Sequence, residues 1–122
     1  MTTPNLVLLY VKDPAASAAF YELLFSQKPT ALFPTYAAFE LDNGLNVGLW
    51  STSAKNFVSG GEGHRSELAF MVGDEAQVRG LLDAWQARGV TIEQPLHKAV
   101  FGPTFVATDP DGHRIRVCTP DA

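Results

Sequence analysis

The chain has 122 residues, a formal net charge of −4 at pH 7 and a hydrophobic content of 46%. This length suits one domain, predicted over residues 1–122, and the composition is that of an ordinary globular protein. No block of Lys or Arg occurs, which disfavours binding to nucleic acid or to a membrane surface, since both draw affinity from basic patches.

Cysteine usage and the N-terminal residues predict a cytoplasmic protein. Cys118 is the only cysteine, so no intrachain disulfide can form and a reducing compartment is expected. Residues 1–4 lack the basic start and long apolar run of a signal peptide. The apolar run at residues 6–11 is too short to cross a bilayer.

The first half predicts a strand, a helix and three further strands. The apolar run at residues 6–11 is strand-like, and Asp13 and Pro14 after it suit the N-cap and first position of a helix. The apolar positions expected along this helix are Ala16, Ala19, Phe20, Leu23 and Leu24. Strands are then expected at residues 29–33, 36–41 and 45–50, with a hairpin turn at residues 42–44.

The second half predicts the same order of elements. Residues 67–72 are strand-like, Asp74 is the expected N-cap, and Gln77 completes a capping-box-like pair. The helix that follows carries apolar residues at helical spacing and ends at Gly89; these residues are Val78, Leu81, Leu82 and Trp85. Strands are expected at residues 91–93, 104–108 and 113–118, with a turn at residues 109–112.

The two halves therefore form a repeat. The caps Asp13 and Asp74 are half the chain apart, and Leu24 in one helix matches Trp85 in the other. Each half reads β-α-β-β-β, which predicts an α+β fold. Module 1 is expected at residues 1–52, a glycine-rich joint at 53–65 and module 2 at 66–122.

Three motifs accompany this paired repeat: Val-x-Asp before each helix, Phe20-Tyr21 within the first helix, and Thr-Asp-Pro-Asp-Gly-His at residues 108–113. With these motifs the chain resembles the glyoxalase/bleomycin-resistance/dioxygenase (vicinal oxygen chelate) superfamily. The resemblance covers essentially the whole chain. It implies two modules whose sheets curve around a shared cavity, with the helices on the outside.

Side-chain alternation along the strands of that fold predicts which residues line the cavity. Leu68, Phe70 and Val117 are expected to meet a helix. The cavity wall is expected to collect three aromatic residues, a methionine and two charged residues, which are Tyr10, Tyr36, Trp50, Met71, Glu67 and Arg116.

Metal-dependent members of the superfamily place His or Glu at positions that here hold Leu6, Glu67 and Arg116. Leucine has no donor atom and a guanidinium has no lone pair, so one carboxylate alone remains. No metal and no cofactor are therefore expected. The three histidines, His64, His97 and His113, are expected in loops or beside turns as surface or capping residues.

Catalytic residues are not expected either. Cys118 lies on a predicted strand without an identifiable base, and the sequence shows neither a nucleophile elbow nor a glycine-rich phosphate loop.

Within the superfamily the chain resembles the phenazine (griseoluteate) resistance proteins, through residues 5–6, 10–11, 49–51, 66–67, 100–105 and 109–118. This resemblance implies a homodimer with cavities between subunits and a planar drug stacked on aromatic rings. The leading interpretation is metal-independent, non-catalytic binding and sequestration of a planar aromatic antibiotic, which would confer resistance.

The candidate ligand-binding residues carry alternatives. Trp50 is expected to stack on the ligand, while Tyr10 and Tyr36 either supply a hydroxyl or close the cavity edge. Phe57 and Phe101 lie in loops that either cover the site or meet the dimer partner. Glu67 and Arg116 are expected to form an ion pair across adjacent strands. This pair either stabilises the fold, or it opens so that Arg116 binds a ligand carboxylate.

Two other functions stay open. One is a metal-dependent lyase, isomerase or dioxygenase that uses His64 with Glu67. The other is a structural or regulatory dimer whose cavity holds nothing specific.

Overall fold

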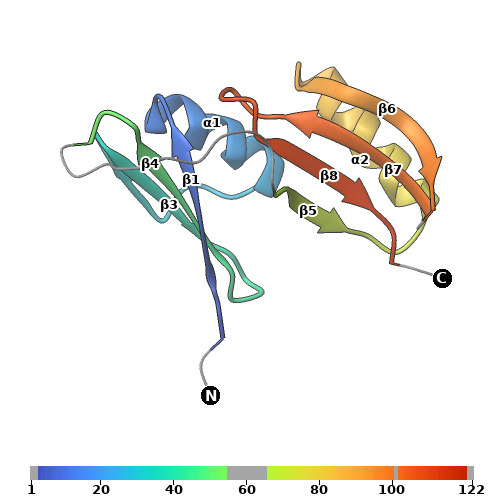
Figure 1. The fold of residues 1–122 in the computed structure, drawn as a ribbon, viewed down its shortest axis with the longest axis horizontal. Coiled ribbons are helices and arrows are strands. Elements are labelled where there is room, and N and C mark those ends of the chain that lie inside the picture. Colours follow the sequence, from blue (N-terminus) through green and yellow to red (C-terminus); the bar gives the residue numbers. More distant parts are fainter. Residues whose placement is uncertain (1–2, 55–65, 101, 121–122) are drawn as a thin grey trace. The chain divides into compact units, whose positions relative to one another are not determined.

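The computed structural model describes residues 3–54, 66–100 and 102–120 (Figure 1). The chain divides into two units, Met1–Gly61 and Glu62–Ala122. Each unit contains one helix and one four-stranded sheet in its described part. The predicted α+β class is confirmed, and that the two units form a single domain stays a prediction.

The first unit contains β1 (Leu6–Val11), α1 (Pro14–Phe25), β2 (Ala31–Phe33), β3 (Tyr36–Glu40) and β4 (Asn46–Ser51). Its sheet has the strand order β1-β4-β3-β2. β1 pairs with β4 in parallel, and the other pairs are antiparallel. All five elements are those predicted from the sequence.

The second unit repeats this plan with β5 (Leu68–Met71), α2 (Glu75–Ala87), β6 (Thr91–Ala99), β7 (Gly102–Thr108) and β8 (Arg114–Cys118). The strand order β5-β8-β7-β6 is equivalent to that of the first sheet. Figure 1 shows α2 lying against one face of this sheet. The equivalence supports the predicted repeat.

Strand β6 is longer than the sequence analysis expected. The expected strand ended at Glu93, whereas β6 continues through Pro95 to Ala99. Because β6 is the last strand of its sheet, one side of it needs no ladder partner, and a proline without an N–H is tolerated there. The pairing with β7 shifts register between Gln94 and His97. The expectation that His97 lies in a loop or beside a turn is therefore wrong.

The predicted helix caps are present. The Asp13 carboxylate accepts hydrogen bonds from the backbone N–H of Ala15 at 3.0 Å and of Ala16 at 3.4 Å. Asp74 accepts one from the N–H of Gln77 at 2.9 Å, and the Gln77 side chain accepts one from the N–H of Gly73 at 2.6 Å. This pair is similar to a capping box, except that the Gln77 side chain accepts from the N–H of Gly73, the residue before the cap, and not from that of Asp74.

The buried face of α1 differs from the expected one. Of the expected positions, Leu24 is buried, whereas Ala16 and Ala19 are exposed. The helix also buries Pro14, Ser17, Ala18 and Tyr21. Apolar residues lie on several sides of this helix, so composition alone does not select the face. In α2 the expected face is confirmed, because Val78 and Trp85 are buried.

Each helix covers one face of its own sheet, and the core of each unit lies between that helix and that sheet. In the second unit the Trp85 ring packs edge-on against Phe70 and Phe105, with centroid distances of 5.4 and 5.5 Å. In the first unit Tyr21 and Phe39 are fully buried. Neither described helix is long and apolar enough to cross a membrane.

The turn before β8 is organised by one buried carboxylate. The Asp109 side chain has no exposed surface and accepts hydrogen bonds from the N–H groups of Asp111 at 3.0 Å and His113 at 2.8 Å. Its other oxygen lies 2.7 Å from His113 Nδ1. The hydrogen bond to Asp109 raises the pKa of His113. His113 is thus a turn histidine, as the sequence predicted.

Removal of the Asp74 cap is expected to destabilise the protein. Asp74→Ala leaves the N–H of Gln77 without its acceptor, so the free energy of unfolding should fall by about 1 kcal/mol. Asp83→Ala, at an exposed position within α2, is the matched control and should cost less than about 0.5 kcal/mol. Urea denaturation measures both; equal losses would contradict a capping role.

The His113–Asp109 pair should make stability depend on pH. Because the folded-state pKa is raised, its stabilisation is complete below the ordinary pKa of 6.5 and is lost as the pH rises through the folded-state value. The difference in unfolding free energy between wild type and His113→Gln should therefore shrink as the pH is raised from about 5.5 to 9. The same series with His97→Gln is the control. A difference that stays constant over this range would refute the pair's contribution.

Candidate functional site

The open face of the first sheet, opposite α1, carries a row of aromatic side chains. In register, Tyr10 of β1 lies beside Trp50 of β4, Trp50 beside Tyr36 of β3, and Tyr36 beside Phe33 of β2. Their neighbours along the strands, such as Val11 and Leu49, are buried under the helix. We call these four residues the aromatic row. The strand alternation predicted from the sequence for Tyr10, Tyr36 and Trp50 is thus confirmed.

The aromatic row is partly accessible. Tyr10 is 44% and Phe33 61% exposed, whereas Tyr36 and Trp50 are half-buried. The Tyr10 and Trp50 rings meet edge to face, with centroids 6.3 Å apart and planes at 65°. Leu6 and Leu8 extend the exposed apolar surface along β1. Contiguous apolar surface of this kind is typical of interaction sites.

Sequence reasoning did not find Phe33. The residue lies in a strand that was predicted, but its place in the row depends on the pairing of β2 with β3. The turn between these two strands, at residues 34 and 35, holds the only local signal for that register. A hairpin reading of this turn would have placed Phe33 beside Tyr36.

The open face of the second sheet carries an ion pair. Arg116 Nε donates to Glu67 Oε1 at 2.7 Å and Arg116 Nη2 donates to Glu67 Oε2 at 3.1 Å. This bidentate pair confirms the predicted one. The Arg116 hydrogen bond lowers the pKa of Glu67, and Glu67 in turn raises the pKa of Arg116.

Thr104 completes this cluster and was missed by the sequence analysis. Its hydroxyl accepts a hydrogen bond from Arg116 Nη1 at 3.1 Å and donates one to the Val117 carbonyl at 2.8 Å. Thr104 is fully buried, because Arg116 lies over it. Its role follows from the register of β7 with β8, which the sequence pattern does not specify.

Met71 and the remaining predicted residues are placed as follows. Met71 is 69% exposed and lies opposite Cys118 in the parallel pairing of β5 with β8. Phe57, Phe101 and His64 lie outside the described residues.

The donor set at the positions used by metal-dependent relatives does not fit a metal. Leu6 offers no donor atom, and Arg116 is a cation without a lone pair. Both oxygens of the remaining carboxylate, Glu67, accept hydrogen bonds from Arg116. Within residues 3–54, 66–100 and 102–120, no three His, Cys, Asp or Glu side chains gather closely enough to hold a metal ion.

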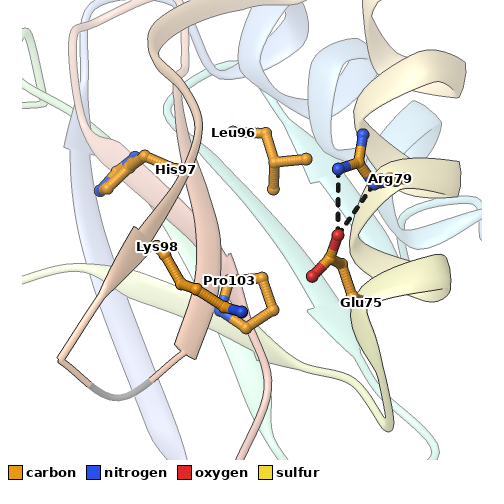
Figure 2. Close-up of a pocket in the computed structure, with 6 residues that line it drawn as sticks. All are labelled: Glu75, Arg79, Leu96, His97, Lys98 and Pro103. Atoms are coloured by element: carbon orange, nitrogen blue, oxygen red, sulfur yellow. Dashed lines mark hydrogen bonds and ion pairs between the residues drawn. The ribbon is translucent and has the colours of Figure 1, made fainter.

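A separate hollow of about 390 Å³ lies in the second unit, between the start of α2 and the β6–β7 hairpin. Figure 2 shows the Leu96 side chain directed toward Arg79, which forms an ion pair with Glu75 at 3.0 Å. Lys98 and Pro103 form the other wall, and His97 points away from it. The described residues that line the hollow include no Phe, Tyr or Trp.

The Glu67–Arg116 pair is expected to stabilise the fold in a pH-dependent way. Glu67→Gln replaces charge-assisted hydrogen bonds by neutral ones and should lower the free energy of unfolding by about 1–3 kcal/mol at pH 7. Because the folded-state pKa of Glu67 is lowered, the difference should be present above the ordinary pKa of 4.5 and vanish as the pH falls through the folded-state value.

The measurement is urea denaturation of both proteins from pH 7 to pH 3. Glu93→Gln, which weakens the Arg114–Glu93 ion pair in the same sheet, is the matched control. A loss that is independent of pH would contradict the electrostatic explanation.

Comparison with known proteins identifies the family. The model of the Glyoxalase/Bleomycin resistance protein/Dioxygenase superfamily matches residues 3–117. The phenazine antibiotic resistance protein EhpR of Enterobacter agglomerans is 34% identical to this chain, in an alignment that covers 98% of this chain and 93% of that protein.

Solved structures agree. The solution NMR structure of a protein from Agrobacterium tumefaciens superposes with a TM-score of 0.86 at 41% identity over 100% of both chains. A lactoylglutathione lyase from the same organism shares the fold, with a TM-score of 0.77 at 20% identity, covering 98% of this chain and 94% of the lyase. The chain belongs to the glyoxalase/bleomycin resistance/dioxygenase superfamily.

Proposed function

We propose that this protein binds and sequesters a planar aromatic antibiotic of the phenazine type, without a metal ion and without altering it, and thereby confers resistance. The observation that carries the proposal is the aromatic row on the open face of the first sheet. Four aromatic side chains from four neighbouring strands form a broad apolar surface, and a flat molecule can stack on the faces of individual rings within it.

The energetics of such a site are adequate for useful binding. Removing about 250 Å² of apolar ligand surface from water contributes roughly 6 kcal/mol. Stacking on one or two rings adds about 0.5–1.5 kcal/mol each. The total corresponds to a dissociation constant on the order of micromolar before ordering costs. A single stack alone is too weak, so the whole row is needed.

Three further observations support the proposal. The relative EhpR, 34% identical, is itself a phenazine antibiotic resistance protein. The donor set around Glu67 does not suit a metal, which favours binding without one. Exposed Leu6 and Leu8 on β1 favour a homodimer, the assembly that the sequence resemblance implies.

Arg116 is directed to Glu67 in this structure, which favours a role in holding the sheet over one in binding a carboxylate.

The decisive experiment is a titration of metal-stripped protein with phenazine-1-carboxylate, followed by tryptophan fluorescence and by calorimetry. Saturable quenching is expected in the presence of EDTA, with the ligand recovered unchanged. Trp50→Ala should lose most of the quenching, because Trp85 is buried under its sheet, and should weaken calorimetric binding at least tenfold.

Leu32→Ala is the matched control. Leu32 is exposed and lies on the same sheet, but with the opposite parity to Phe33, so affinity should be unchanged. Binding that requires added metal, or recovery of a modified ligand, would refute the proposal.

A further inference from the structure

Gly48, at the centre of the first sheet, is a glycine for reasons of space. It lies on β4, between Leu8 of β1 and Ala38 of β3. A Cβ added at Gly48 would lie 2.7 Å from Leu8 Cδ2 and 3.0 Å from Tyr36 Cε1, and closest of all to the Tyr36 hydroxyl. A glycine inside a strand costs stability and typically marks such a close approach.

The missing side chain determines where Tyr36 lies. Tyr36 pairs directly with Trp50, and Gly48 is its diagonal neighbour on the same face. Diagonal neighbours are within reach of a long aromatic side chain. The Tyr36 ring and Leu8 Cδ2 therefore both occupy the space above Gly48. This places the phenol hydroxyl of Tyr36, a member of the aromatic row, above Gly48 on the open face.

The Tyr36 hydroxyl is a hydrogen-bond donor at a mostly apolar surface. Among the residues that the structure describes, no protein group forms a hydrogen bond with it. Tyr36 is half-buried, and a hydroxyl in such surroundings gains most from a partner that the ligand brings. The atoms of a flat ring system that accept a hydrogen bond in the plane of the ring are heteroatoms, such as the nitrogens of a phenazine.

We propose that Gly48 is a positioning residue: by leaving space above β4 it holds the Tyr36 hydroxyl where it donates a hydrogen bond to a ring heteroatom of the ligand. The site then favours planar nitrogen heteroaromatics over hydrocarbons of the same shape. This inference rests on the proposed function and adds the basis of its selectivity.

The test compares two ligands of nearly equal shape, phenazine-1-carboxylate and anthracene-1-carboxylate, by calorimetry. Tyr36→Phe removes only the hydroxyl. It should weaken phenazine-1-carboxylate binding about fivefold, the effect of one neutral hydrogen bond, and leave anthracene-1-carboxylate binding unchanged. The ratio of the two affinities is thus the measured quantity, because a purely structural effect would change both affinities alike.

Gly48→Ala should reduce the same ratio about fivefold, and the double variant with Tyr36→Phe should show no further loss, because both changes remove one interaction. Gly80→Ala is the matched control, since a Cβ there meets nothing within 4 Å; it should leave the ratio unchanged. If Gly48→Ala does not fold, the ratio is measured in Gly48→Ala combined with Leu8→Ala, against Leu8→Ala alone.

The outcomes separate the two proposals. Wild-type protein that binds neither ligand refutes the proposed function. Wild-type protein that binds both, with a ratio that Tyr36→Phe or Gly48→Ala does not change, overturns the selectivity inference and leaves the proposed function standing. A ratio that falls in both variants but not in Gly80→Ala supports the inference.

Discussion

The structure depends on one constraint: each sheet is covered by a single helix, on one face only. Residues such as Phe39, Leu49, Phe105 and Val117 point toward α1 or α2 and are fully buried. Because side chains alternate along a strand, every second residue must then point to the other face. That face carries no helix of its own unit, so the residues on it are available for function. Core residues and site residues therefore alternate along each strand.

The two repeated units use their open faces differently. The first presents aromatic and aliphatic side chains. The second presents a polar cluster, in which Arg116 contacts Glu67 and Thr104. In both units the strand at the centre of the site is the fourth strand of that unit, β4 in the first and β8 in the second. Each of these strands pairs with a neighbour on both sides. The two units therefore share the scaffold, since the helix-facing strand residues are apolar in both, and they differ on the open face.

The sequence predicted what is local and left open what depends on pairing. The caps Asp13 and Asp74 and the turn at Asp109 were recognisable, because each bonds to backbone within a few residues. The ion pair followed from the family alignment and strand alternation together. Phe33 and Thr104 were missed, since their roles arise from lateral register. The extension of β6 through Pro95 was missed because proline normally argues against a strand. It is tolerated here because β6 lies at the edge of its sheet, a position that the sequence alone does not reveal.

That edge has a further consequence for the protein's behaviour in concentrated solution. An outer strand with a regular ladder is a template on which another chain can add and begin an aggregate. In β6, Pro95 removes one backbone donor and the shifts around Gln94 and His97 interrupt the ladder. Both features make β6 a poorer template for a second strand than a regular edge would be. Under the proposed sequestration, the protein would have to accumulate to the concentration of the drug, and an interrupted edge would favour that concentration over aggregation.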